Sequence, residues 1–312
     1  MRQSPSHDVR PRPDADGPLD TGVRDLGRLD DTQRAARAAA TGGCPVLTFD
    51  GARTPYIDYQ SVDVLHSLQQ PRSGAPAELT FYVLGQVKEL LFKLMYEDLR
   101  RVRDDLDADA VGAAVWSLHR LRKVADLLVN TWDVLGTLSP SEFNSFRDHL
   151  GDASGLQSYM YRMLEFVLGN KRPSLTTPHA GVPHVSEQVR RALEERSVYD
   201  AAVALLARRG AAIDPATLRH DPARPRPDCP TVEQAWRDVY RELGPADEVF
   251  RLAEALMDVA EAMSRWRALH LLVVERTIGN KPGTGGSSGA AWLRRVNEHR
   301  FFGELWAARS VL

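Results

Sequence analysis

Two features near the C-terminal end of the chain could do chemistry. His270 lies in an apolar run of helical character, and a glycine-rich segment, residues 283–289 (Gly-Thr-Gly-Gly-Ser-Ser-Gly), follows it. A helical histidine can bind a metal, and such a glycine loop can surround a small polar ligand with backbone N–H groups and hydroxyls. Facing one cavity, they would form a metal centre beside a ligand clamp. Lying apart, they would be a core histidine and a flexible linker.

The neighbours of His270 narrow the kind of metal site. Leu269 and Leu271 offer an imidazole no polar partner, and Arg267 and Glu275 do not complete a zinc-binding set. An axial haem ligand needs a single neutral imidazole on a rigid helix in an apolar pocket. The pattern therefore favours haem over a cluster of protein ligands. A histidine that is hydrogen-bonded within the core is the structural alternative.

The other candidate residues also have structural alternatives. The glycine loop is not a P-loop, because its lysine precedes the glycines and no strand leads into it. Thr284 and the loop amides could instead hold a carboxylate or an ammonium group. Arg147 lies one turn after Phe143 on an otherwise apolar helical face, and it could bind a carboxylate or be solvated. Phe143, Phe81 and Trp132 are equally consistent with a core.

Composition excludes several classes of protein. The 312 residues include 40 basic and 42 acidic side chains, for a net charge of −2, so a general nucleic-acid binder is not expected. Cys44 and Cys229 are far apart and have no metal-binding spacing. No apolar run of about 18 residues is present, and the N-terminus lacks the apolar core of a signal peptide. We therefore expect a cytoplasmic protein without membrane association.

Apolar periodicity predicts an all-α fold. Residues 1–45 are rich in Pro, Asp, Gly and Arg and are predicted to be a disordered tail, followed by one helical domain over residues 46–312. Ser139-Pro-Ser-Glu142 and Thr231-Val-Glu-Gln234 have the pattern of capping boxes. Helices are expected at about 76–106, 111–135, 140–151, 155–168, 185–209, 231–244, 246–278 and 290–311.

Three blocks of sequence, together with a weaker one, resemble the tryptophan 2,3-dioxygenase family over about residues 55–310. The first block is 132–151, which continues into 154–158 and 165–171; the second is 266–270; the third is the glycine loop; and the weaker one is 56–71 followed by Glu89-Leu90. The resemblance implies an all-α helical bundle around a pocket for haem b. It also implies a homotetramer in which an N-terminal arm, about residues 50–72, reaches into a neighbouring subunit's active site.

By this resemblance, His270 would be the proximal ligand of the haem iron, and Trp132 would lie near the haem on the same side. Phe81 would line the distal pocket. Ser154 and Gly155 would border the distal face. The remaining family positions concern the substrate.

Some of the substrate-binding positions carry the residue that the family has, and others carry a different one. Arg147 would pair with the substrate carboxylate and Thr284 would bind the amino-acid head group. Gly85 stands where bacterial members carry a distal histidine that contacts the indole N–H, and Phe143 stands where they carry a tyrosine near the carboxylate. Gln60 replaces a leucine of the indole pocket. Losing one hydrogen bond to a charged group typically costs about 1.5–3 kcal/mol.

Two further pocket residues and two reactions follow from the resemblance, and a third function is an alternative to both. Tyr56 and Tyr59 occupy the positions of the aromatic residues in the arm. The chain would use O2 to cleave the indole C2–C3 bond of tryptophan, giving N-formylkynurenine. Alternatively, it would insert one oxygen into tryptophan or a methylated tryptophan, giving a 2-oxindole in a specialised pathway. A catalytically inactive sensor of haem or an amino acid is the third possibility.

Overall fold

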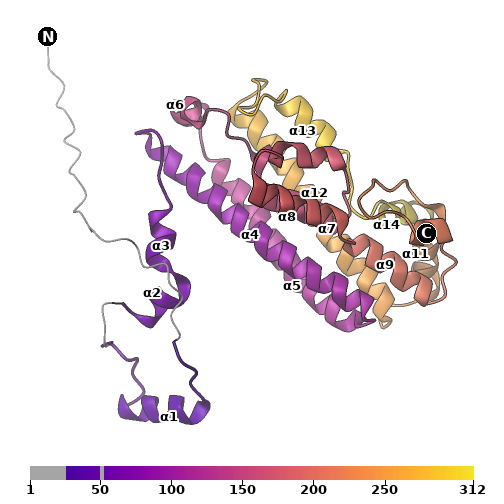
Figure 1. Cartoon of the computed structure of the whole chain (residues 1–312), viewed down its shortest axis with the longest axis horizontal. Coiled ribbons are helices and arrows are strands. Elements are labelled where there is room, and N and C mark those ends of the chain that lie inside the picture. The colour runs from indigo at the N-terminus through magenta and orange to yellow at the C-terminus, as the bar shows by residue number, and fades with distance from the viewer. Residues whose placement is uncertain (1–25, 50–52) are drawn as a thin grey trace. The chain divides into compact units, whose positions relative to one another are not determined.

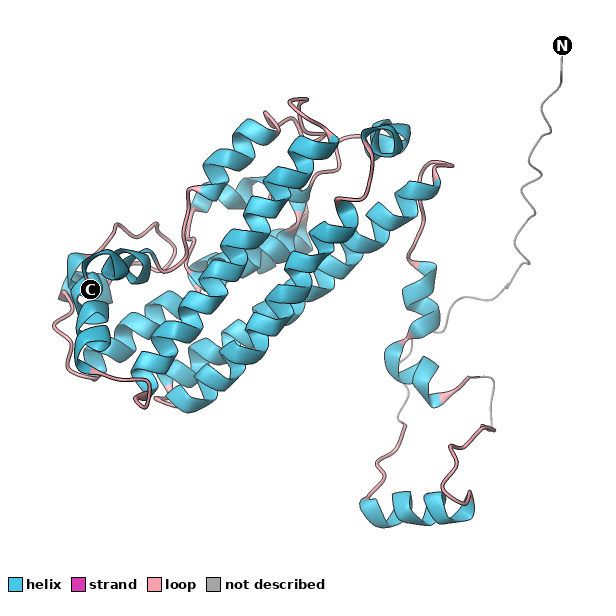
Figure 2. Ribbon diagram, turned by 180° about the vertical axis from the view of Figure 1, so that it is seen from behind, coloured by secondary structure: helices cyan, strands magenta, loops and turns pink. Residues whose placement is uncertain are grey.

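The computed structural model describes residues 26–49 and 53–312, and within them it contains helices and loops but no strand (Figure 2). The all-α prediction is confirmed. The chain divides into two compact units, an N-terminal unit that ends at Gln70 and a C-terminal unit, Pro71–Leu312. None of the described helices is both long and apolar enough to cross a membrane.

The N-terminal unit contains short helices. They are α1 (Asp31–Ala40), α2 (Pro55–Gln60) and α3 (Val62–Ser67). Asp30 caps α1 by accepting from the Gln33 N–H at 2.8 Å, and the Gln33 side chain accepts from the Asp30 N–H at 2.9 Å. The predicted disordered tail therefore contains a helix, because this capping box satisfies the first N–H groups locally. Residues 1–25 of that tail lie outside the described residues.

The C-terminal unit is built on three long helices. Figures 1 and 2 show α4 (Pro76–Asp107), α5 (Val111–Leu135) and α12 (Glu248–Thr277) running side by side. The shorter helices are α6 (Pro140–Arg147), α7 (Tyr159–Leu168), α8 (Pro183–Glu194), α9 (Val198–Arg208), α10 (Pro215–Leu218), α11 (Pro230–Glu242), α13 (Ala290–Asn297) and α14 (Gly303–Ala308). Single 3₁₀ segments lie at Asp148–Leu150, Gly155–Gln157, Pro173–His179 and Arg309–Val311.

The core of the C-terminal unit follows from the apolar spacing of the long helices. Leu99 of α4, Leu118 and Leu128 of α5, and Leu252 and Leu256 of α12 are fully buried. Residues three or four apart in a helix share one face, so α4 and α12 each present an apolar stripe to α5, which packs against both. The predicted bounds of these three helices agree with the structure to within about two residues.

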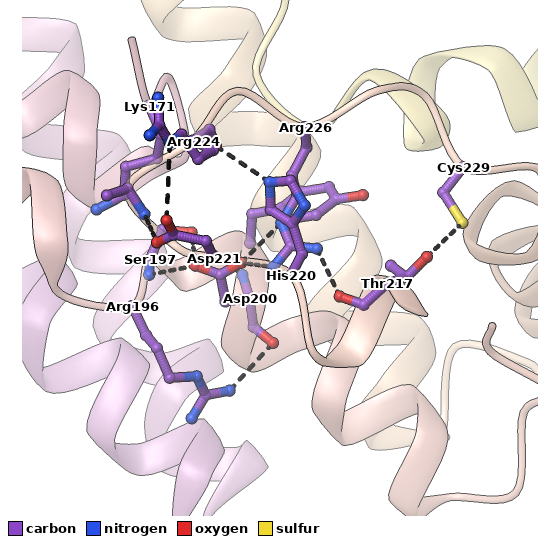
Figure 3. A network of polar contacts seen from close by, with 12 residues as sticks. Lys171, Arg196, Ser197, Asp200, Thr217, His220, Asp221, Arg224, Arg226 and Cys229 are labelled. Carbon is purple, nitrogen blue, oxygen red and sulfur yellow. Dashed lines mark hydrogen bonds and ion pairs between the residues drawn. The ribbon is translucent and has the colours of Figure 1, made fainter. Parts of the chain in front are cut away.

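The helix predicted over residues 185–209 is wrong, because the structure has two helices there, α8 and α9. Ser197 and Asp200 form a capping box that starts α9, with N···O distances of 2.7 and 3.2 Å. The carbonyls at the end of α8 accept hydrogen bonds from the buried Lys171 Nζ: Ala192 at 2.7 Å, Leu193 at 3.0 Å and Glu195 at 2.6 Å. Figure 3 shows the polar network at this junction.

Three other predicted segments differ from the structure. The expected capping box at Thr231 is wrong: α11 starts at Pro230, and its N-cap Cys229 makes no side-chain capping bond. The terminal helix breaks into α13 and α14 because Phe302 has a φ of +54° with its ring buried. Residues 155–168 form a 3₁₀ turn and then α7, since Ser158 caps a new helix start.

Candidate functional site

The helix pair α5 and α12 brings His270 against Trp132. The two rings stack with centroids 4.6 Å apart and planes inclined by 12°. Trp266, one turn earlier on α12, lies with its ring centroid 5.7 Å from that of Trp132. Phe92 of α4 packs edge-on against Trp266 at 5.5 Å. His270 is therefore held on one side by an aromatic wall contributed by three different helices.

His270 has the protonation state of a metal ligand. Burial lowers its pKa to about 3, and the nearby Lys88 ammonium lowers it further, so the imidazole is neutral at physiological pH. Within the described residues neither ring nitrogen of His270 forms a hydrogen bond, so the alternative of a hydrogen-bonded core histidine loses its support. In the same part of the chain, no group of three or more His, Cys, Asp or Glu side chains could hold a bare ion. A cofactor that needs one protein ligand fits these observations.

Hydrogen-bond donors without acceptors gather beside His270. The indole N–H groups of Trp132 and Trp266 are buried and have no partner among the described residues. The Lys88 ammonium lies 3.3 Å from the centroid of the Trp132 ring. We call Lys88, Trp132 and Trp266 the donor cluster. Buried donors without acceptors are costly, and an apolar ring system that carries carboxylates would satisfy them, so these residues fit a haem.

One face of α4 continues this wall. Phe81, Gly85 and Lys88 follow each other at spacings of four and three residues, which places them on the same side of the helix. The Phe81 ring packs against Phe143 at 5.7 Å and Phe146 at 5.5 Å, both from α6. A side chain added at Gly85 would meet no atom within 4 Å. The position predicted to lack a distal histidine therefore borders open space.

Arg147 reaches the candidate clamp from the end of α6. Ser139 and Glu142 start this helix with the predicted capping box, which is confirmed. The Arg147 Nη2 donates to the Pro282 carbonyl at 2.5 Å, just before the glycine loop. Its Nε–H is buried and has no partner in the part of the chain that the structure describes. The guanidinium is thus fixed by one backbone contact and keeps donor capacity for a carboxylate.

The glycine loop is packed against residues 152–154, which contradicts the flexible-linker alternative. The Thr284 hydroxyl donates to the Ala153 carbonyl at 2.7 Å. A Cβ added at Gly285 would lie 2.5 Å from the Cβ of Ser154, so this close approach requires glycine. Gly289 has a φ of +60°, and a Cβ there would lie 2.5 Å from the Lys281 carbonyl oxygen.

Ser154 and Gly155 lie on the segment that supports the loop. The Ser154 side chain accepts from the Leu156 N–H at 3.4 Å and is the N-cap of a 3₁₀ turn. A Cβ added at Gly155 would have no atom within 4 Å. Their expected position at the distal face of a haem stays a prediction.

The structure brings most of the predicted residues together in two groups. One contains His270 and Trp132, and the other contains Arg147 and Thr284 through their contacts with Pro282 and Ala153. Phe81 meets Phe143 beside the second group. The binding role of each residue stays a prediction.

Three predicted residues belong to the other unit. Tyr56, Tyr59 and Gln60 are exposed on α2, and the two tyrosines expose 69% and 75% of their surface. Lys88 was not among the predicted site residues. Its signal was present in the sequence, since it follows Gly85 by three residues within an apolar stretch.

Comparison with known proteins gives a consistent family. A sequence model described as Tryptophan 2,3-dioxygenase matches residues 42–179 and 180–312. The tryptophan 2,3-dioxygenase of Burkholderia multivorans is 43% identical over 257 residues, which are 82% of this chain and 83% of the relative. Proteins of the same name from Ralstonia pickettii and Polaromonas sp. are 42% and 41% identical over 82% of this chain, and the matches cover 92% and 87% of them.

Proposed function

The chain belongs to the tryptophan 2,3-dioxygenase family, and on that premise we propose that it is a haem-dependent enzyme that inserts both atoms of O2 across the indole C2–C3 bond of L-tryptophan. The observation that carries the proposal is the neutral His270 stacked on Trp132 beside donors that have no acceptor. The product would be N-formylkynurenine.

His270 supplies the protein ligand of the haem. Its neutral imidazole offers a nitrogen lone pair, and its stacking on Trp132 fixes the plane of the ring. When bound, haem b supplies the ferrous iron that activates O2. The aromatic wall of α4, α5 and α12 excludes water from this side of the site.

Arg147 and the glycine loop hold the amino-acid end of the substrate. The Pro282 carbonyl fixes one Nη of Arg147, which leaves Nε–H to donate to the carboxylate. The Thr284 hydroxyl already donates to Ala153, so its oxygen is free to accept from the substrate ammonium. A ligand that bears both charges is thus recognised from two sides.

The indole end of the substrate meets few polar groups from this unit. Gly85 borders open space, and Phe143 is a buried ring that packs against Phe81. Ring cleavage does not require a base at Gly85, because the indole can react before its N–H proton is lost. The space beside Gly85 would also admit a substituted tryptophan, which makes methylated tryptophans a second set of substrates to test.

We further infer that the enzyme is a homotetramer in which segment 50–72 completes a neighbouring subunit's site. On α4, Leu79, Val87, Leu90 and Leu94 are exposed at helical spacing, which is the pattern of a helix face that another chain covers. Light scattering on the purified protein tests the assembly. A monomer that is fully active would contradict it.

The activity is tested by the mass of the product formed from L-tryptophan under ¹⁸O2. The haem-loaded, reduced protein should give N-formylkynurenine that carries two labelled oxygens. A product with one labelled oxygen would replace this proposal with the monooxygenase that forms a 2-oxindole. If tryptophan changes the haem spectrum but neither it nor its methylated forms are converted, the protein is a sensor.

A further inference from the structure

Lys88 is the least expected residue of the donor cluster. It is partly buried on α4, and its ammonium lies over the Trp132 ring at 3.3 Å. Within residues 26–49 and 53–312, the Lys88 ammonium has two interactions. One is this cation–π contact, and the other is its electrostatic effect on His270. No carboxylate forms an ion pair with it in that part of the chain. Lys88 therefore places an amine at the site whose protonated form has no protein counter-charge among the described residues.

The surroundings of Lys88 favour an anion. Burial lowers the pKa of Lys88 to about 7, which reflects the cost of a desolvated ammonium that no carboxylate offsets. The Trp132 N–H is a second buried donor without an acceptor, on the ring that Lys88 covers. An indole N–H can only donate, so it requires an acceptor of the same kind as the ammonium does. Among the described residues, Lys88 of α4 and Trp132 of α5 therefore both lack a hydrogen-bond acceptor, which an anion would supply.

We propose that Lys88 forms an ion pair with a carboxylate of the haem, with the Trp132 N–H as the second donor to that anionic edge. This inference rests on the proposed function, since it assumes that haem binds at His270. It makes Lys88 a determinant of cofactor binding. The substrate carboxylate is a weaker candidate for this contact, because the buried Arg147 Nε–H beside the glycine loop is available to it.

The test compares haem with its dimethyl ester, in which both carboxylates are neutral. The dissociation rate of each ligand from the full-length protein is measured by transfer to a haem acceptor, for wild type, Lys88→Met, Lys88→Arg and Lys93→Met. Lys93 is an exposed lysine of the same helix and serves as the matched control. Circular dichroism reports whether each variant is folded.

Wild type should retain haem more strongly than the ester by roughly 10- to 100-fold, the ratio expected for a hydrogen bond to a charged group. Lys88→Met should lose most of that preference and leave ester binding nearly unchanged. Lys88→Arg should keep most of the preference, because it keeps the charge. Lys93→Met should behave as wild type.

Several results would overturn the ion pair while leaving the proposed function in place. One is equal retention of haem and ester by wild type. This comparison tests the ion pair even if Lys88→Met does not fold. Another is an equal loss of both ligands in Lys88→Met, which would make Lys88 a packing residue. A change in the spin state of the iron in Lys88→Met without a change in preference would place the amine at the iron. Failure of wild type to bind either ligand would instead refute the proposed function.

Discussion

Two polar regions of the C-terminal unit differ in how far the protein satisfies its own hydrogen-bonding groups. At the junction of α8 and α9 (Figure 3), Asp200 accepts from Ser197 N–H at 2.7 Å and from Arg226 Nε at 2.9 Å. Lys171 donates to three carbonyls there, and Arg196 bonds Asp107 at 2.8 Å. In the donor cluster, by contrast, two indole N–H groups have no acceptor.

The polar groups of the first region are paired within the protein, whereas the N–H groups of the donor cluster are left without acceptors in the described part of the chain. In the α8–α9 network, formed by Lys171, Arg196, Ser197, Asp200 and Arg226, each charge meets an opposite charge or a backbone carbonyl. Such a network ends one helix and starts the next. The donor cluster contributes little of this kind to folding. The proposed haem would supply acceptors for its unpaired donors.

The largest stability effect is expected in the α8–α9 network. Asp200→Ala removes the counter-charge of Arg226 and one side of the capping box, so it should destabilise the protein by about 3–5 kcal/mol. Chemical denaturation measures this change. Asp258→Ala, at an exposed position of α12, is the matched control and should have little effect. Haem affinity of the folded fraction should stay as in wild type, and a specific loss of haem in Asp200→Ala would remove the distinction between the two regions.

The next effect is expected at the substrate clamp. Arg147→Met removes the donors to the substrate carboxylate and should raise KM for tryptophan by roughly 10- to 100-fold, with haem content unchanged. Steady-state kinetics measure KM, and a spectral titration with tryptophan measures its binding. Arg251→Met, on the exposed surface of α12, should leave both as in wild type. An unchanged KM in Arg147→Met would show that the carboxylate binds elsewhere.

The smallest effect is expected at Gly85. Gly85→Ala fills open space on a helix and should stabilise the protein by about 1 kcal/mol, seen as a higher Tm. Gly85→His adds a hydrogen-bonding group at the same place and should bind tryptophan roughly 2- to 10-fold more tightly than Gly85→Ala does. Equal affinity in the two variants would show that the indole nitrogen does not lie near this position.

The sequence predicts a helix well where neighbouring residues determine its ends, and less well where residues distant in the sequence determine them. The apolar spacing of α4, α5 and α12 and the capping box at Ser139 are local, so their helices are predicted well. The breaks at Ser197 and Phe302 are missed because the apolar period continues across both, although Ser197 and Asp200 form a local capping box. At Phe302 the left-handed backbone is maintained by burial of the ring, which depends on distant residues.

The candidate site shows the same limit. Residue types and spacing single out His270, Arg147 and Thr284, because each has chemistry suited to haem or an amino acid. The stacking of His270 on Trp132 joins residues 138 positions apart (270 − 132) and needs the packing of α5 on α12. The apolar stretch around Lys88 is visible in the sequence, but the missing counter-charge of its amine is visible only in the structure, since a lysine on a helix is ordinarily solvated.

We propose that haem binds beside the unpaired N–H groups of Trp132 and Trp266, with His270 as the protein ligand of its iron. Haem content and the ferrous absorption spectrum of the purified wild-type protein, measured beside His270→Ala, test it most directly. His119→Ala, an exposed histidine of α5, is the control. Wild type and His119→Ala should hold one haem per chain with the spectrum of a histidine ligand, and His270→Ala should lose the haem or that spectrum. A His270→Ala protein with the wild-type haem content and spectrum would show that His270 is not the haem ligand.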